Sequence, residues 1–252
     1  MPDLPAAFLG APIAHRALHD GNITRAENNF AAIDAAIAGG FAIEIDLQLS
    51  ADGVAMVFHD YALSRLTLDA GAFALRKADD LANVRFKTGE IGIPPLARVL
   101  AHVAGRVPLL IEVKDQDGAM GPNVGALERA AAAALSTYDG PVALMSFNPH
   151  SVAALAEVCP HLPRGLTTCD WTNGEAGMIP SALRPALRGI VDFDRVGASF
   201  ISHQWSDLTA PRVRELKAAG AHILCWTIKS PEEEAQARQI ADNITFEGYV
   251  PT

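Results

Sequence analysis

The stretch EIDLQLSADGVAMVFHD, residues 44–60, places two carboxylates in a short apolar segment and a His-Asp pair shortly after it. Side chains of an extended strand alternate between two faces, so Glu44 and Asp46 of the predicted strand Ala42–Leu47 point the same way. Two carboxylates buried side by side repel each other and lose hydration, which costs several kcal/mol or more without a partner. A cation is therefore expected between them.

Short apolar runs like this one recur along the chain, with helical stretches between them. Several are almost continuously apolar, which is typical of strands buried on both faces of a parallel sheet. The eight runs are Pro12–His15, Ala42–Leu47, Leu109–Val113, Val142–Phe147, Gly165–Thr168, Val196–Ser202, His222–Ile228 and Asn243–Phe246. Eight strand–helix alternations predict an α/β fold, a (β/α)8 TIM barrel, with a doubly wound sheet as the competing fold.

The connections between the runs mostly have helical character. The expected helices are Glu27–Ala38, Leu96–Val103, Ala126–Ser136, Pro149–Val158, Pro211–Ala219 and Pro231–Ile240, three of which begin with proline at a first helical position. The fifth unit is weaker, because Trp171–Gly189 is rich in glycine and proline. The second connection, Asp60–Val107, is too long for one crossover. With few large apolar residues, it is interpreted as a small insertion after the second strand of a single domain, residues 1–252.

Composition restricts the possible partners. The formal net charge of −9 argues against nucleic acid or an anionic membrane surface as the main partner, but not against a small anion in a locally basic pocket. Cys159, Cys169 and Cys225 have no CxxC spacing, which indicates neither a zinc site nor a disulfide framework. No secretory signal and no apolar run of membrane-spanning length is recognised. A cytoplasmic protein is expected.

A second strand repeats the charged pattern of the first. In Leu109–Val113 and the residue after it, Glu112 and Lys114 share a face among leucine, isoleucine and valine. Convergence of Glu44, Asp46 and Glu112 at the mouth of a barrel gives an oxygen-rich site for one hard divalent cation, Mg²⁺ or Ca²⁺. The alternative is a Glu112–Lys114 salt bridge beside an exposed Glu44 and Asp46 at the surface.

Two of the eight histidines lie beside these strand ends. His15 ends the first run next to Arg16, and His59 follows the extended run Val54–Phe58 next to Asp60. Imidazole titrates near neutral pH, so a facing pair of histidines can act as acid and base in one reaction. Arg16 and Lys114 add positive charge where a phosphate could bind. The remaining six histidines are expected at the surface or in the core.

The ordered set of motifs resembles the glycerophosphodiester phosphodiesterase family. The matching segments are His15-Arg16, Glu27-Asn28, Glu44-Ile45-Asp46, SADGVAMVFHD ending at His59-Asp60, LSRLT (Leu63–Thr67), IPPLARVL before LLIEVK, Ser146-Phe147 and CWTIKS (Cys225–Ser230). Individually these segments are weak signals. Their order along nearly the whole chain is specific.

The resemblance implies a TIM barrel with a small insertion after the second strand. It implies metal ligation by Glu44, Asp46 and Glu112, and acid–base roles for His15 and His59. It also suggests Arg16 and Lys114 as phosphate contacts and Trp226 as a wall of the alcohol pocket.

The chain departs from the family's usual pattern at three places. Ala17 stands where glycine usually follows His-Arg, Ala26-Glu27-Asn28-Asn29 replaces Pro-Glu-Asn-Thr, and Thr245-Phe246-Glu247 replaces Thr-Asp. None of these departures removes a catalytic side chain. They bear on the loop after the first strand and on the identity of the alcohol.

The expected activity is hydrolysis of a glycerophosphodiester, a small-molecule substrate, to glycerol 3-phosphate and an alcohol. A lipid-cleaving lyase of phospholipase D type on the same barrel is the enzymatic alternative. A phosphate-binding barrel without activity is the other, and the presence of both His15 and His59 argues against it.

Overall fold

Parallel strands close into a ring in the computed structural model, which describes residues 2–172 and 179–251. β1 (Ile13–Ala14) pairs with both β2 (Ala42–Leu49) and β9 (Asn243–Phe246), and this double pairing closes the barrel. The other parallel strands are β4 (Leu109–Val113), β5 (Val142–Ser146), β6 (Arg164–Thr168), β7 (Phe200–Gln204) and β8 (His222–Ile228). The predicted (β/α)8 barrel is confirmed, and an open doubly wound sheet is excluded.

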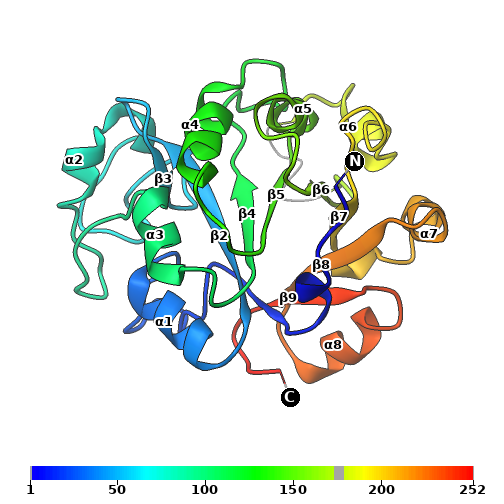
Figure 1. Cartoon of the computed structure of the whole chain (residues 1–252), viewed down its shortest axis with the longest axis horizontal. Coiled ribbons are helices and arrows are strands. Elements are labelled where there is room, and N and C mark those ends of the chain that lie inside the picture. The colour runs from blue at the N-terminus through cyan, green and yellow to red at the C-terminus, as the bar shows by residue number, and fades with distance from the viewer. Residues whose placement is uncertain (1, 173–178, 252) are drawn as a thin grey trace.

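Helices surround the ring of strands (Figure 1). They are α1 (Phe30–Ala38), α2 (Ala78–Leu81), α3 (Leu96–Val103), α4 (Ala126–Leu135), α5 (Pro149–Val158), α6 (Arg184–Arg188), α7 (Pro211–Ala218) and α8 (Pro231–Ala237), with 3-10 turns η1 (Ala6–Leu9), η2 (Phe73–Leu75) and η4 (Trp205–Asp207). Proline occupies the first helical position of α5, α7 and α8, as predicted. α1 begins later than expected because the Asn29 side chain caps it by accepting from the Phe30 amide.

The amino-terminal end of the barrel is filled by apolar side chains. Phe8 of η1 packs with Ile13, Phe200 and Leu224, which point into the barrel. The buried Asn243 side chain donates to the backbone carbonyls of Phe8 and Ala11 and fixes this plug. With this end closed, access to the barrel interior is from the carboxyl ends of the strands, where active sites of this fold lie.

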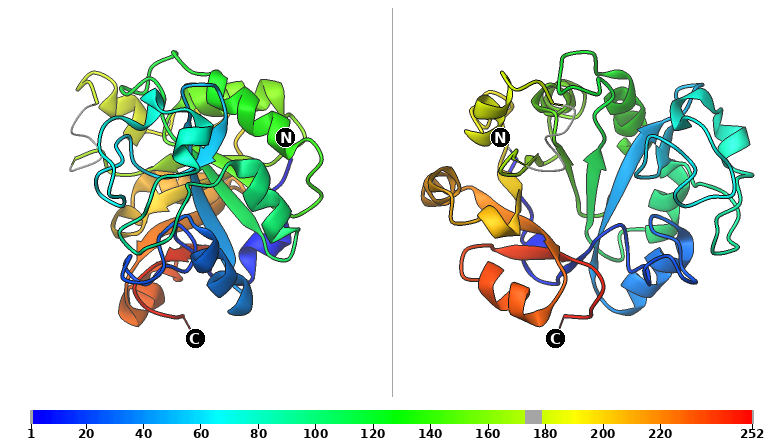
Figure 2. Two further views of the ribbon diagram at one scale, coloured as in Figure 1. Left: turned by 90° about the vertical axis from the view of Figure 1, so that its left-hand side faces the viewer. Right: turned by 180° about the vertical axis from the view of Figure 1, so that it is seen from behind.

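The insertion after β2 lies at one side of the barrel (Figure 2) and has its own small hydrophobic core. β3 (Ala55–Val57) turns back antiparallel to β2, so the predicted extended run adds a short strand outside the ring. Phe58, Phe73 and Phe86 are buried in a cluster separate from the main core. The expectation of few large apolar residues was wrong here, since these aromatic rings are widely spaced in the sequence and only gather in the fold.

The fifth unit is irregular, as expected. Residues 173–178 of the predicted Trp171–Gly189 connection lie outside the described residues, and α6 is only a short helix. β7 starts at Phe200 rather than Val196, and it continues into the polar residues His203 and Gln204. All three cysteines are buried. In the described ranges, no helix is long and apolar enough to cross a membrane.

Candidate active site

A cavity of about 670 Å³ opens at the carboxyl ends of the strands. It is lined by every residue that was predicted from the sequence to belong to the site: His15, Arg16, Glu44, Asp46, His59, Glu112, Lys114 and Trp226. These residues follow or lie on β1, β2, β4 and β8, with His59 entering from the insertion. The volume is in the range of small-molecule sites.

Three carboxylates form the base of the site. Glu44 and Asp46 point into the barrel from β2, and Glu112 lies beside Asp46 in register on β4. One ligand oxygen from each lies within 4.8 Å of the others, and all three residues are buried. The predicted convergence is present, and three hard oxygen donors could hold one Mg²⁺ or Ca²⁺ ion.

Two cationic side chains border the carboxylates. Lys114 Nζ lies 2.9 Å from Asp46 Oδ1 and 2.8 Å from Glu112 Oε1. Arg16 Nε lies 3.6 Å from Asp46 Oδ2. The alternative Glu112–Lys114 salt bridge therefore exists, but Glu44 and Asp46 are each only 1% exposed and do not form a surface edge.

The charges of this cluster are unevenly compensated. Burial and the neighbouring Asp46 and Glu112 charges raise the pKa of Glu44 well above its usual value. Burial opposes ionisation of Asp46 too, but the positive charges of Lys114 and Arg16 hold its pKa below the usual range. Of the two carboxylates on β2, Glu44 therefore has the less positive charge near it, and a divalent cation bound here would supply that charge.

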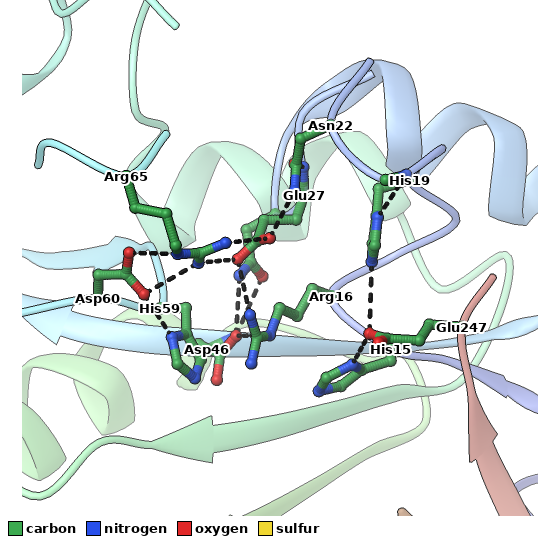
Figure 3. A network of polar contacts seen from close by, with 12 residues as sticks. His15, Arg16, His19, Asn22, Glu27, Asp46, His59, Asp60, Arg65 and Glu247 are labelled. Atoms are coloured by element: carbon green, nitrogen blue, oxygen red, sulfur yellow. Dashed lines mark hydrogen bonds and ion pairs between the residues drawn. The ribbon is translucent and has the colours of Figure 1, made fainter. Parts of the chain in front are cut away.

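His15 is held by a carboxylate from the opposite end of the chain (Figure 3). Its Nδ1 lies 2.6 Å from Glu247 Oε2, just after the last strand. Burial lowers the pKa of His15, although the hydrogen bond to Glu247 raises it. His19 Nε2 and Lys229 Nζ also approach Glu247, at 3.8 and 2.8 Å. This arrangement leaves His15 Nε2 as the ring nitrogen for proton transfer.

His59 has an equivalent partner on the insertion. Its Nδ1 lies 2.7 Å from Asp60 Oδ1. Arg65 donates to both oxygens of Asp60, at 2.6 and 2.9 Å, and to both oxygens of the buried Glu27, at 2.9 and 2.6 Å. Glu27 in turn accepts from Arg16 at 2.9 Å. Ion pairs thus connect the insertion to the floor of the site (Figure 3).

A family comparison agrees with this geometry. The model of the glycerophosphoryl diester phosphodiesterase family matches residues 15–243, from the first of the two histidines to the last strand. The chain belongs to the glycerophosphoryl diester phosphodiesterase family. Its enzyme class is accordingly that of a glycerophosphodiester phosphodiesterase.

Individual proteins and solved structures are also similar to this chain. YhdW of Bacillus subtilis (strain 168) is 25% identical over 219 residues, covering 83% of this chain and 84% of YhdW. A glycerophosphodiester phosphodiesterase structure from Agrobacterium tumefaciens C58 has a TM-score of 0.67 at 25% identity, covering 94% of this chain and 95% of the other. An Oleispira antarctica phosphodiesterase, solved with the product sn-glycerol-3-phosphate, has a TM-score of 0.78 at 23% identity over 96% and 94% of the two chains.

One departure from the phosphodiesterase family's usual motif is accommodated in the loop after β1. Ala17, in place of the usual glycine, has a left-handed φ of 65°, and Arg16 before it has a φ of 52°. Such a conformation costs an alanine about 1–2 kcal/mol. The Arg16 amide donates to Glu44 Oε2 at 2.9 Å, and the Ala17 amide donates to the Glu44 carbonyl at 3.0 Å. These bonds tie the loop to β2 despite the missing glycine.

Some residues around this phosphodiesterase site received no role from the sequence. Glu247, Glu27 and Asn28 contact predicted site residues, and Asn28 donates to Asp46 Oδ2 at 2.8 Å. Arg65 is linked to them through Glu27 and Asp60. The available signal for Glu247 was an acidic residue directly after the last strand, where the usual Thr-Asp is altered. Arg65 lies in LSRLT, which matched the family without indicating a contact.

Proposed function

We propose that this chain hydrolyses glycerophosphodiesters to glycerol 3-phosphate and an alcohol, with a divalent cation and with His15 and His59 as general acid and base. One observation carries the proposal: two histidines, each bound through Nδ1 to a carboxylate, border one cavity that also contains the three clustered carboxylates. The sn-glycerol-3-phosphate bound to the Oleispira antarctica phosphodiesterase is consistent with a small diester substrate.

The cation would be held by Glu44, Asp46 and Glu112. It would supply positive charge for the phosphate and for a coordinated hydroxyl, whose pKa it lowers. Arg16 and Lys114, which line the same cavity, are proposed to add phosphate contacts. Trp226 is proposed as a wall of the alcohol pocket: its ring is fixed by a 2.9 Å hydrogen bond from Nε1 to the Ser202 carbonyl and by edge contact with Phe147.

The two histidines are proposed to act on different oxygens, one on the attacking hydroxyl and the other on the ester oxygen of the departing alcohol. One removes the proton of the hydroxyl next to the ester carbon, which attacks phosphorus, while the other protonates the departing alcohol. Water then opens the cyclic phosphate with the proton roles reversed. The attack is intramolecular, and good orientation can contribute about 7–11 kcal/mol. The Nδ1–carboxylate bonds favour this role, because they orient both rings and stabilise the imidazolium that forms.

The deciding experiment is a coupled assay for glycerol 3-phosphate over a panel of glycerophosphodiesters. Release of glycerol 3-phosphate is expected for at least one headgroup. Accumulation of a cyclic phosphate without opening would indicate the lyase alternative. Binding without turnover of any diester would indicate the inactive barrel.

Metal dependence is tested by chelation. Because three buried carboxylates share one small volume, chelation is expected to abolish turnover, and Mg²⁺ or Ca²⁺ to restore it and to raise Tm by mass action. Asp46→Asn is expected to lose the Tm response to the ion. Asp34→Asn, on the exposed face of α1, is the matched control and keeps it. Full turnover in a protein shown to be metal-free contradicts the proposal.

A further inference from the structure

The barrel interior changes character from one side of the cavity to the other. Inward-facing residues from successive strands line it: Glu44 on β2, Glu112 on β4, Met145 on β5, Thr167 on β6, Ser202 on β7, Trp226 on β8 and Thr245 on β9. The carboxylates lie on β2 and β4. The hydroxyls lie on the neighbouring strands β6 and β7 and on β9, which β8 separates from β7.

These three hydroxyls are buried without partners. Thr167, Ser202 and Thr245 are 2%, 1% and 2% exposed. Their Oγ atoms form no hydrogen bond within the described part of the chain. Thr167 and Ser202 are direct register partners on adjacent strands, so their side chains lie next to each other on the cavity wall. A buried hydroxyl without a partner is unfavourable, so three of them lining one cavity indicate a surface completed by a bound polar group.

The chemistry of the wall selects the kind of group. A hydroxyl both donates and accepts, which matches another alcohol. The charged oxygens of a phosphate are drawn instead to the side that carries Arg16 and Lys114. Every glycerophosphodiester has one arm with the same two free hydroxyls and another arm that varies. A fixed set of buried hydroxyls suits the invariant arm.

We propose that Thr167, Ser202 and Thr245 form a polyol subsite that binds the terminal hydroxyl of the glycerol arm. This proposal rests on the function proposed above and adds the orientation of the substrate. The glycerol arm lies inside the barrel, with its other hydroxyl beside phosphorus and near the carboxylates. The variable alcohol points to the mouth, where the half-exposed Tyr61 lines the opening, and leaves from there.

The test compares two substrates that differ by one hydroxyl. One is a glycerophosphodiester; the other carries propane-1,2-diol in place of glycerol, so it keeps the attacking hydroxyl and lacks the terminal one. The parent enzyme is expected to prefer glycerol by roughly tenfold or more in kcat/KM. Thr167→Val and Ser202→Ala are each expected to lower kcat/KM for the glycerol substrate by about 3- to 10-fold and to leave the propanediol substrate within twofold.

The control is a hydroxyl of the same kind outside the cavity. Ser199 Oγ is also buried and unpartnered within the described residues, and Ser199 does not line the cavity. Ser199→Ala is expected to change neither substrate. Equal losses on both substrates in Thr167→Val and Ser202→Ala, with Tm unchanged, would show a structural role and overturn the proposal. Unchanged kcat/KM for the glycerol substrate in both variants would overturn it as well.

A binding experiment tests this proposal independently of the proposed function. Calorimetry with sn-glycerol 3-phosphate and with propane-1,2-diol phosphate, in the presence of Mg²⁺, reports on the subsite without turnover. Tighter binding of the glycerol compound that is lost in Ser202→Ala supports the subsite even if no diester is hydrolysed. Equal binding of the two compounds by the parent protein refutes the subsite even if hydrolysis is fast.

Discussion

Replacement of Glu247 by Gln tests the bond that holds His15. The glutamine keeps the shape of the side chain and one acceptor oxygen but removes the negative charge 2.6 Å from Nδ1. A hydrogen bond to a charged group contributes about 1.5–3 kcal/mol. If that stabilisation of the imidazolium is lost in the transition state, kcat falls roughly 10- to 150-fold. KM is expected to change little, because the proposed role of Glu247 is to position His15 and not to contact substrate.

The pH profile gives a second measurement on the same variant. Glu247 raises the pKa of His15 against the lowering effects of burial and Arg16, so removal of its charge lowers that pKa further. The limb of the kcat profile that belongs to His15 therefore moves to lower pH, and the other limb stays. A shifted alkaline limb identifies His15 as the acid, and a shifted acidic limb identifies it as the base.

Initial rates of glycerol 3-phosphate release from pH 5 to 9 provide both measurements. Glu215→Gln, on the exposed side of α7, is the matched control and should match the parent enzyme. A Glu247→Gln variant with kcat within threefold of the parent and with both limbs unmoved would refute the reasoning. The His15–Glu247 bond would then be a feature of the fold without a part in the reaction.

The remaining predictions concern the histidines, the nucleophile and the buried ion pairs. His15→Ala or His59→Ala should lower kcat by roughly 10²–10⁴-fold, and the loss in the double variant should be much smaller than the product of the two single losses. His102→Ala on α3 should match the parent enzyme, and a comparable loss of kcat at His102 would contradict the assignment. A diester whose hydroxyl next to the ester carbon is replaced by hydrogen should inhibit competitively but scarcely turn over, and cleavage at a comparable kcat would indicate water as the nucleophile. Burial alone would raise the pKa of Glu27, but hydrogen bonds from Arg65 and the charge of Arg16 lower it from 4.5 to about 2. The ionised Glu27 therefore stabilises the folded state fully above pH 4.5, and this stabilisation is lost as the pH falls through 2. Glu27→Gln should lower the free energy of unfolding by about 3 kcal/mol at pH 7 and by less at pH 3.5 in urea titrations, and an equal loss at both pH values would exclude this linkage.

The strands were predictable because each is a buried apolar run between turn residues. β4, β8 and β9 have the predicted bounds. The prediction for β7 failed at its start, because Val196 and Ala198 are buried in the main core although they precede the strand. Its last two residues, His203 and Gln204, were also missed. They are polar, and His203 bonds Thr168, so the hydrophobic pattern stops before the strand does.

The site was predictable where its residues belong to a local pattern. Period-two spacing placed Glu44 with Asp46, and strand ends placed His15 and His59. The partners of these residues were not predictable in the same way. Glu247 meets His15 only because β9 lies next to β1, and Arg65 meets Glu27 only after the insertion folds back over the barrel. Such contacts depend on tertiary arrangement, and no local pattern encodes them.

The bond between His15 and Glu247 joins residues 232 positions apart, and this has a consequence during synthesis. A ribosome makes His15 232 residues before Glu247, so the nascent chain carries an imidazole without this partner until Glu247 has been synthesised. Pairing of β1 with β9 is a late, long-range event of the kind that slows folding. In a synchronised translation reaction, activity should therefore appear only after Glu247 has been made and β9 has paired with β1.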